Sequence, residues 1–288
     1  MGRISNLFRN INYLSKHSLW DQREEDILYL TNKIIDDVGY DYGLNFDNKI
    51  KVLDFDNTFE LLEKTQKSFV RIGDGEIRLI NGENQPFQIY EEEIADRLKS
   101  VLRVQQENLY VGINYSYYSH FPFDYERRNA YDFRCSMSKL CNHDITYIDA
   151  GVTCAKIPFA PHDVASEYVT RWKNMFKNKD IVIVCGAGVL DKLSYDVFEY
   201  ANSKRFIYGL RKNSWDEHDR IMEEITSSVK KGELLVFILG MAGKAMIPDL
   251  VNIGYTCWDV GHLAKYYDAY MKNMIWDSEN TKKFYMPD

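Results

Sequence analysis

The stretch L-L-V-F-I-L-G-M-A-G-K, residues 234–244, decides the fold class of this chain. Its six leading apolar residues predict a strand buried on both faces, as in a parallel sheet. The glycines and the run to about Ile253 predict a turn and then a helix. A second apolar strand, I-V-I-V-C at 181–185, also ends in glycines, Gly186-Ala-Gly188. This alternation indicates an α/β protein.

The same alternation extends outward from these two strands, more clearly in the second half of the chain. Periodicity predicts further strands at 68–72, 109–113, 205–209 and 255–259, and helices at 21–37, 57–66, 91–106, 163–176, 190–201 and 215–231. We expect Asp163 to cap its helix, and Ser214 with Glu217 to form a capping box. The fold we predict is Rossmann-like: a mostly parallel sheet with helices on both faces.

The chain shows no internal repeat and no Pro/Gly/Ser linker, so we divide it into one domain with two extensions. We predict an N-terminal helical extension at 1–48, a nucleotide-sugar-binding catalytic domain at 49–273 and a C-terminal tail at 274–288. Within the extension, residues 3–20 form a short basic amphipathic pattern. It fits a helix packed on the domain or on a second subunit, in a homo-oligomer, and also a helix lying on a membrane surface.

Composition narrows the classes of partner and compartment. Of 288 residues, 36 are Lys or Arg and 43 are Asp or Glu, giving a net charge of −7, so the broad basic surface of a nucleic-acid-binding protein is missing. Five cysteines without a C-x-x-C pair favour a reducing compartment. The sequence has neither a transmembrane run nor a signal peptide. We therefore expect a cytoplasmic protein.

Three polar segments directly follow predicted strands, where ligands of parallel sheets bind. The first is Arg71-Ile-Gly73-Asp74-Gly75-Glu76. Its glycines allow the backbone to approach a ligand, and its two carboxylates, close together on a turn, are hard oxygen ligands suited to Mg²⁺ or Mn²⁺. A polar turn with solvated acids fits the bare pattern as well.

The second segment, Gly240-Met-Ala-Gly243-Lys244, starts a helix after a strand. Free amides at a helix start beside an ammonium group are typical of a diphosphate site. The spacing differs from that of a P-loop, and the Ser or Thr that would follow its Lys is missing, which disfavours ATP hydrolysis. An ordinary turn with a solvent-facing Lys remains an alternative.

The third segment is Trp258-Asp259-Val260-Gly261-His262. We expect His262 to bind phosphate, ligate a metal or transfer a proton, with Asp259 orienting its ring; an ordinary hydrogen-bonded histidine also fits. Asn114, after another strand, is a candidate contact for a base or ribose. Gly186-Ala-Gly188 is no dinucleotide fingerprint, because Asp191 stands where the third glycine belongs.

As an ordered set, these segments resemble a family of bacterial glycosyltransferases of the GT-D fold, formerly a domain of unknown function numbered 1792. The resemblance covers roughly residues 65–270. It rests on R-I-G-D-G-E at 71–76, W-K-N-M-F-K-N-K-D-I-V-I-V at 172–184 and L-G-M-A-G-K-A-M-I-P-D-L-V-N-I-G-Y-T-C-W-D-V-G-H at 239–262.

The resemblance implies a GT-D-type fold, a UDP-sugar donor and a D-x-E motif that holds Mn²⁺ or Mg²⁺ against the diphosphate. Carried over, that motif is Asp74 and Glu76. It also implies a glycan or glycoprotein acceptor in the synthesis of bacterial surface glycans. We assign Arg71, Lys244 and His262 to the phosphate charge, and Gly73, Asn114, Gly240 and Gly243 to the donor site.

Two other functions stay open at this point. The same acids suit a metal-dependent hydrolase of nucleotides or phosphate esters, and the same cleft suits a non-catalytic nucleotide-sugar-binding module that assists a partner transferase. Sequence alone identifies neither the donor sugar nor the general base.

Overall fold

The structure is a computed structural model, and it describes residues 50–118, 133–134, 136–154, 156–158 and 160–285. The expected helix at 21–37 and the basic segment at 3–20 lie outside these residues. Among the described helices, none is long and apolar enough to cross a membrane.

A single sheet of eight parallel strands organises the described part of the chain, in the order β1-β4-β3-β2-β8-β7-β5-β6. This confirms the predicted parallel α/β fold. The strands are β1 Lys51–Val52, β2 Ser68–Ile72, β3 Leu109–Ile113, β4 Thr146–Asp149, β5 Asp180–Gly186, β6 Ser203–Gly209, β7 Leu234–Ile238 and β8 Thr256–Asp259.

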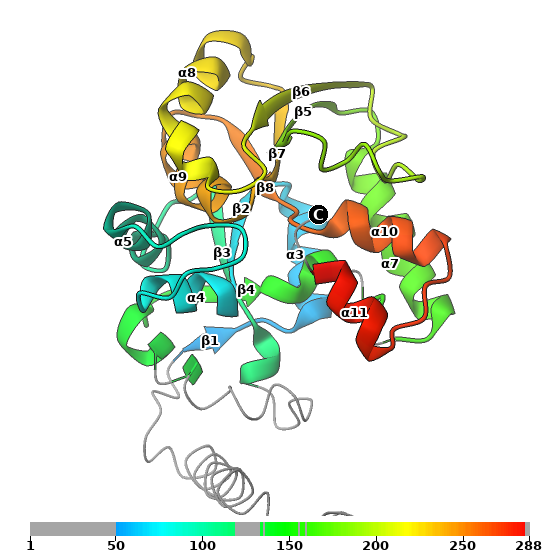
Figure 1. The fold of residues 1–288 in the computed structure, drawn as a ribbon, viewed down its shortest axis with the longest axis horizontal. Coiled ribbons are helices and arrows are strands. Elements are labelled where there is room, and N and C mark those ends of the chain that lie inside the picture. The colour runs from blue at the N-terminus through cyan, green and yellow to red at the C-terminus, as the bar shows by residue number, and fades with distance from the viewer. Residues whose placement is uncertain (1–49, 119–132, 135, 155, 159, 286–288) are drawn as a thin grey trace, which may run out of the picture.

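Helices cover both faces of the sheet, as Figure 1 shows. On one face lie α4 Asp74–Ile80, α5 Glu92–Val101, α8 His218–Ser228 and α9 Gly240–Asn252. On the other face lie α3 Phe55–Thr65, α7 His162–Phe176, α10 Leu263–Met271 and α11 Ser278–Tyr285. Helices α3, α5, α7 and α8 each bury one apolar stripe in the core, which is why their amphipathic pattern could be recognised in the sequence.

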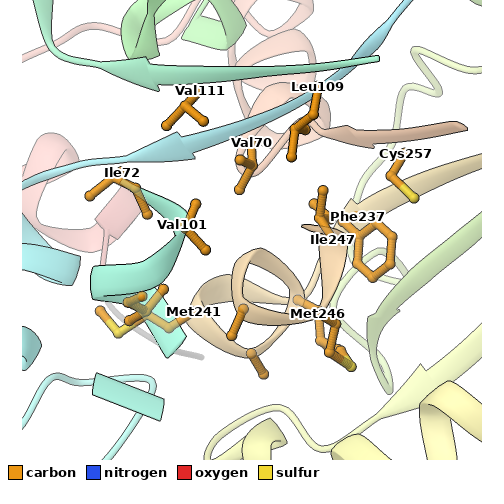
Figure 2. Close-up of a cluster of buried hydrophobic side chains, with 14 of the residues drawn as sticks. Val70, Ile72, Val101, Leu109, Val111, Phe237, Met241, Met246, Ile247 and Cys257 are labelled. Carbon is orange, nitrogen blue, oxygen red and sulfur yellow. The ribbon is translucent and has the colours of Figure 1, made fainter. Parts of the chain in front are cut away.

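Successive side chains of each strand point alternately toward the two helical layers. Val70 and Ile72 of β2 pack toward the α9 layer, together with Phe237 of β7 (Figure 2). Phe69, the residue before Val70, points the other way and joins an aromatic cluster with Trp172 of α7. Two-sided burial explains why these strands are apolar without interruption.

The predicted helix at 190–201 is wrong: this connection between β5 and β6 runs as a series of turns. Carboxylates hold it by accepting hydrogen bonds from backbone amides. Asp268 of α10 accepts from the amides of Ser194 and Tyr195, and Asp196 accepts from the amide of Phe198. Side chains that bind amides in this way compete with a helix for the same donors.

Two predicted helix caps are also wrong. Ser214 donates to the carbonyl of Leu210 instead of capping, and Glu217 pairs with Arg220, so a 3₁₀ turn precedes α8. Helix α7 begins at His162 after Pro161, without a side-chain cap. Prediction also missed three helices, α4, α10 and α11.

Candidate functional site

A cavity of about 870 Å³ opens at the carboxyl edge of the sheet. Parallel strands bring their carboxyl ends to this one edge, so the segments that follow them meet there. Every strand from β2 to β8 contributes, through Gly73, Asn114, Ala150, Gly186, Leu210, Gly240 and Gly261 respectively. The three segments singled out from the sequence therefore converge on one space.

Glu76 lies on the first turn of α4, not on an open turn. One carboxylate oxygen, Oε2, accepts from the amide of Gly73 at 2.7 Å, which closes the start of the helix. The other, Oε1, lies 2.6 Å from Nζ of Lys244 on α9. The two side chains are only 8% and 12% exposed. A nearly buried ion pair thus links the first and second segments inside the cavity.

Asp74 also lines the cavity, two residues before Glu76. Within the described part of the chain its carboxylate has no hydrogen bond or ion pair, so both oxygens are available to a ligand. No three His, Cys, Asp or Glu side chains cluster into a metal site among those residues. Asp74 would hold a Mg²⁺ or Mn²⁺ ion through its carboxylate, and a substrate phosphate would supply further oxygen ligands.

Arg71 is used inside the protein rather than left free for phosphate. Its Nε donates to the carbonyl of Asp259 at 2.9 Å, and Nη2 lies 3.0 Å from Oδ1 of the same residue. Nη1 donates to the carbonyl of Ala150 and to Oγ1 of Thr153. Arg71 still lines the cavity, but its main role here is to tie β2 to β8 and β4.

Asp259 is engaged in the same way, so it does not orient His262 as the sequence suggested. Besides the Arg71 side chain, its Oδ2 accepts from the Arg71 amide at 3.0 Å. Gly261 makes room for this arrangement. Its φ of +50° favours glycine, and a Cβ there would lie 2.1 Å from Nη2 of Arg71.

His262 sits at the cavity wall as the residue before α10. Burial, together with the nearby cations Lys265, Arg71 and Lys244, lowers its pKa to about 3. The imidazole is therefore neutral at pH 7. A neutral ring can accept or donate a hydrogen bond, but it cannot neutralise phosphate charge.

The two glycines of the second segment have different surroundings. Gly240 lines the cavity at the start of α9, with φ of +58° and open space where a Cβ would be. Gly243 lies outside the cavity wall. A Cβ on it would meet Cδ1 of Phe237 at 2.9 Å, so this glycine lets α9 approach β7 closely.

The glycosyltransferase GT-D fold family matches residues 69–286 of this chain, a span that contains the whole cavity edge from β2 to α11. The chain belongs to this family. Its architecture agrees: a solved structure of domain of unknown function 1792 superposes with a TM-score of 0.72, at 24% identity over 84% of this chain and 86% of that one.

Other relatives of this GT-D domain come from streptococci. "Glycosyltransferase GlyD" of Streptococcus pneumoniae serotype 4 is 28% identical over 228 residues, 76% of this chain and 27% of that protein. "Probable glycosyl transferase Gly" of Streptococcus gordonii is 25% identical over 77% of this chain and 33% of its own length. The chain thus spans about a quarter to a third of these relatives.

The GT-D domain also places residues at the cavity that the sequence analysis did not single out. Lys265 follows His262 by one helical turn on α10, and Tyr285 comes from α11. Arg211 and Lys212 follow β6. The apolar spacing of Leu263, Tyr266, Tyr267 and Tyr270 would have revealed α10, and Lys265 with it. Nothing local in the sequence marks the other three.

Proposed function

We propose that this chain transfers a sugar from a UDP-sugar to a hydroxyl group of a glycan or glycoprotein acceptor. One observation carries the proposal. A nearly buried lysine, Lys244, lies in the first turns of α9 and lines the same cavity as the carboxylate of Asp74, at the carboxyl edge of a GT-D sheet. This combination suits a diphosphate accompanied by a divalent cation.

The diphosphate binds, in this proposal, where α9 begins. The first amides of a helix lack partners within it and carry partial positive charge. Gly240 keeps this end open, because no side chain stands between its backbone and the cavity. Lys244 follows one turn later and supplies a full positive charge. Asn114 lines the same cavity, and we assign it to the nucleoside.

The residues that would hold the cation are Asp74 and, once its pair with Lys244 opens, Glu76. A bound Mn²⁺ or Mg²⁺ supplies a charge that stabilises the departing diphosphate. Electrostatic competition explains why the pair between Glu76 and Lys244 would open. The donor's phosphates would compete with Glu76 for Lys244, which would free the Glu76 carboxylate to hold the cation.

Charge develops on the diphosphate oxygen as its bond to the anomeric carbon breaks, so Lys244 and the α9 amides stabilise the transition state more than the ground state. Each such group contributes about 2 to 4 kcal/mol. His262 is neutral, and we therefore assign it a hydrogen bond to the substrate in place of a charge contact. Arg71 acts indirectly by fixing the cavity floor.

Sugar transfer with purified protein tests the proposal. Radiolabelled UDP-glucose, UDP-galactose and UDP-N-acetylglucosamine are supplied with Mn²⁺, with and without an oligosaccharide mixture. Asp74→Asn and Lys244→Met should each lower transfer about 100-fold or more. The control Asp249→Asn, an exposed acid at the other end of α9, should leave it unchanged.

The same assay separates the alternatives. Release of free sugar at one rate with or without acceptor indicates a hydrolase and rejects the transferase. Saturable UDP binding without turnover of any donor indicates a binding module. Normal transfer by both site variants would reject the assigned residues.

A further inference from the structure

The edge strand β6 carries an exposed apolar strip. Phe206, Tyr208 and Leu210 occupy alternate positions, so they share one face, and they are 40%, 45% and 41% exposed. The rings of Phe206 and Tyr208 are parallel, with centroids 5.6 Å apart. Ile207, between them, is buried toward α8. We call these three residues the β6 strip.

Among the helices in the described part of the chain, none covers the β6 strip. On its side of the sheet, α7 and α10 pack over the neighbouring strands, and the connection at 187–201 runs as turns that bury Val197 and Phe198 instead. Neighbouring apolar side chains that share an exposed face are often functional when they adjoin a cavity.

The strip is continuous with the cavity. Leu210, its last residue, lines the cavity together with Gly186 and Val189 of the β5–β6 connection. Arg211 and Lys212 come next and line the same mouth. Both are exposed, and neither has an ion-pair partner within the described residues. A ligand on the strip therefore reaches the cavity beside two free cationic donors.

We propose that the β6 strip, with Arg211 and Lys212, is the acceptor subsite, and that its ligand is an oligosaccharide. This inference rests on the proposed function. The C–H faces of pyranose rings are apolar and stack on aromatic rings, while their hydroxyls accept hydrogen bonds from cationic side chains. An acceptor lying along β6 brings its terminal hydroxyl past Leu210 into the cavity.

Sugar transfer requires a path by which the acceptor hydroxyl enters the cavity. The acceptor oxygen forms a bond to the donor's anomeric carbon, the bond from that carbon to the diphosphate breaks, and UDP leaves with the electron pair. The hydroxyl proton is released to solvent. Donor phosphates lie near Lys244 in the proposal, so the acceptor must come from another part of the cavity mouth, and the β6 strip adjoins it.

The size of the strip favours a sugar over a second copy of this chain. Three side chains about two-fifths exposed present on the order of 250 Å². Stable dimers bury about 800 Å² per partner, several times more. Two or three stacked sugar rings match the smaller area.

A glycan array tests the subsite directly. Fluorescently labelled protein is applied to arrayed oligosaccharides of glucose, galactose and N-acetylglucosamine, and bound signal is compared for the wild type, the double variant Phe206→Ser/Tyr208→Ser and Tyr200→Ser. Tyr200 is a matched control, because it is 49% exposed but lies beside Asn178, at the amino edge of the sheet. We expect at least a tenfold loss in the double variant and none in the control.

Two further measurements make each outcome decisive. The rise in melting temperature caused by UDP reports binding at the donor site separately. Suppose that this rise persists, but the wild type binds no arrayed sugar, or the double variant binds sugar as well as the wild type does. The subsite is then overturned and the proposed function stands. Absence of the UDP shift with strip-dependent sugar binding would reject the proposed function and overturn the acceptor role, leaving the strip as a sugar-binding surface. Self-association abolished by the double variant, with sugar binding unchanged, would assign the strip to a second copy.

Discussion

Arg71 joins its own strand β2 to two other segments of the chain at the cavity floor through one guanidinium group. Its partners are the carboxylate and carbonyl of Asp259, the carbonyl of Ala150 and the hydroxyl of Thr153. The Arg71 and Asp259 side chains are 14% and 4% exposed, so solvent does little to screen the pair. Such a pair becomes costly when one partner is displaced, because the other is left buried and uncompensated.

Gly261→Ala should therefore destabilise the protein strongly. The new Cβ would lie 2.1 Å from Nη2 of Arg71, which forces the guanidinium away from Asp259. We expect the free energy of unfolding to fall by about 3 kcal/mol, measured by urea denaturation. Gly82→Ala is the control. It also has a positive φ but open space around the Cβ position, and should cost only about 1 to 2 kcal/mol. Equal losses would contradict this account.

His262 should make stability depend on pH. The unfolded chain takes up a proton on this histidine near pH 6.5, whereas the folded protein, with a pKa of about 3, does not. Stability is therefore complete above pH 6.5 and falls as the pH drops toward 3, by about 2 kcal/mol at pH 5. His262→Gln should flatten that part of the pH profile. A variant that keeps the full wild-type slope would show that the proton binds elsewhere.

At the scale of single residues, the sequence predicted which segments meet. It did not predict which side chains form hydrogen bonds and ion pairs with one another. Asp74 and Lys244 lie at one cavity because each follows a parallel strand, a rule that needs only local patterns. The partner of Arg71 is 188 residues away, and the partner of Lys244 is Glu76. Such pairings depend on strand order and on side-chain reach, which local patterns do not contain.

At the scale of secondary-structure elements, helix α11 contributes both to the core and to the cavity wall. Predicted as part of a tail, it packs Phe284 against Tyr266 and Trp276, with ring centroids 4.8 and 5.0 Å apart. The hydroxyl groups of Tyr285 and Tyr266 share a hydrogen bond, and Tyr285 lines the cavity. Its apolar residues are few, and docking onto α10 stabilises it.

Phe284→Ala should cost about 3 kcal/mol of unfolding free energy, because it removes a buried ring and leaves a void against α10. Lys283→Ala, one residue earlier, should change stability by less than about 0.5 kcal/mol, since that side chain is 71% exposed. Thermal or urea denaturation of both variants checks this. Similar behaviour of the two would mean that α11 does not dock as described.

At the scale of the whole molecule, the parallel α/β class and two helical layers could be predicted because buried strands and amphipathic helices have distinct periods. Strand order could not. The chain places β8 between β2 and β7, so the 71–76 segment meets the 258–262 segment across neighbouring strands. That adjacency positions Arg71 on Asp259 and builds the cavity floor, and it follows from tertiary packing.

The most direct test of the account is a crystal structure of this chain with UDP and Mn²⁺. We predict diphosphate density at the start of α9 within hydrogen-bonding distance of Nζ of Lys244, and an anomalous manganese peak at about 2 Å from an oxygen of Asp74. Nucleotide bound away from this cavity, with Lys244 still paired to Glu76 and Asp74 free of metal, would contradict the account.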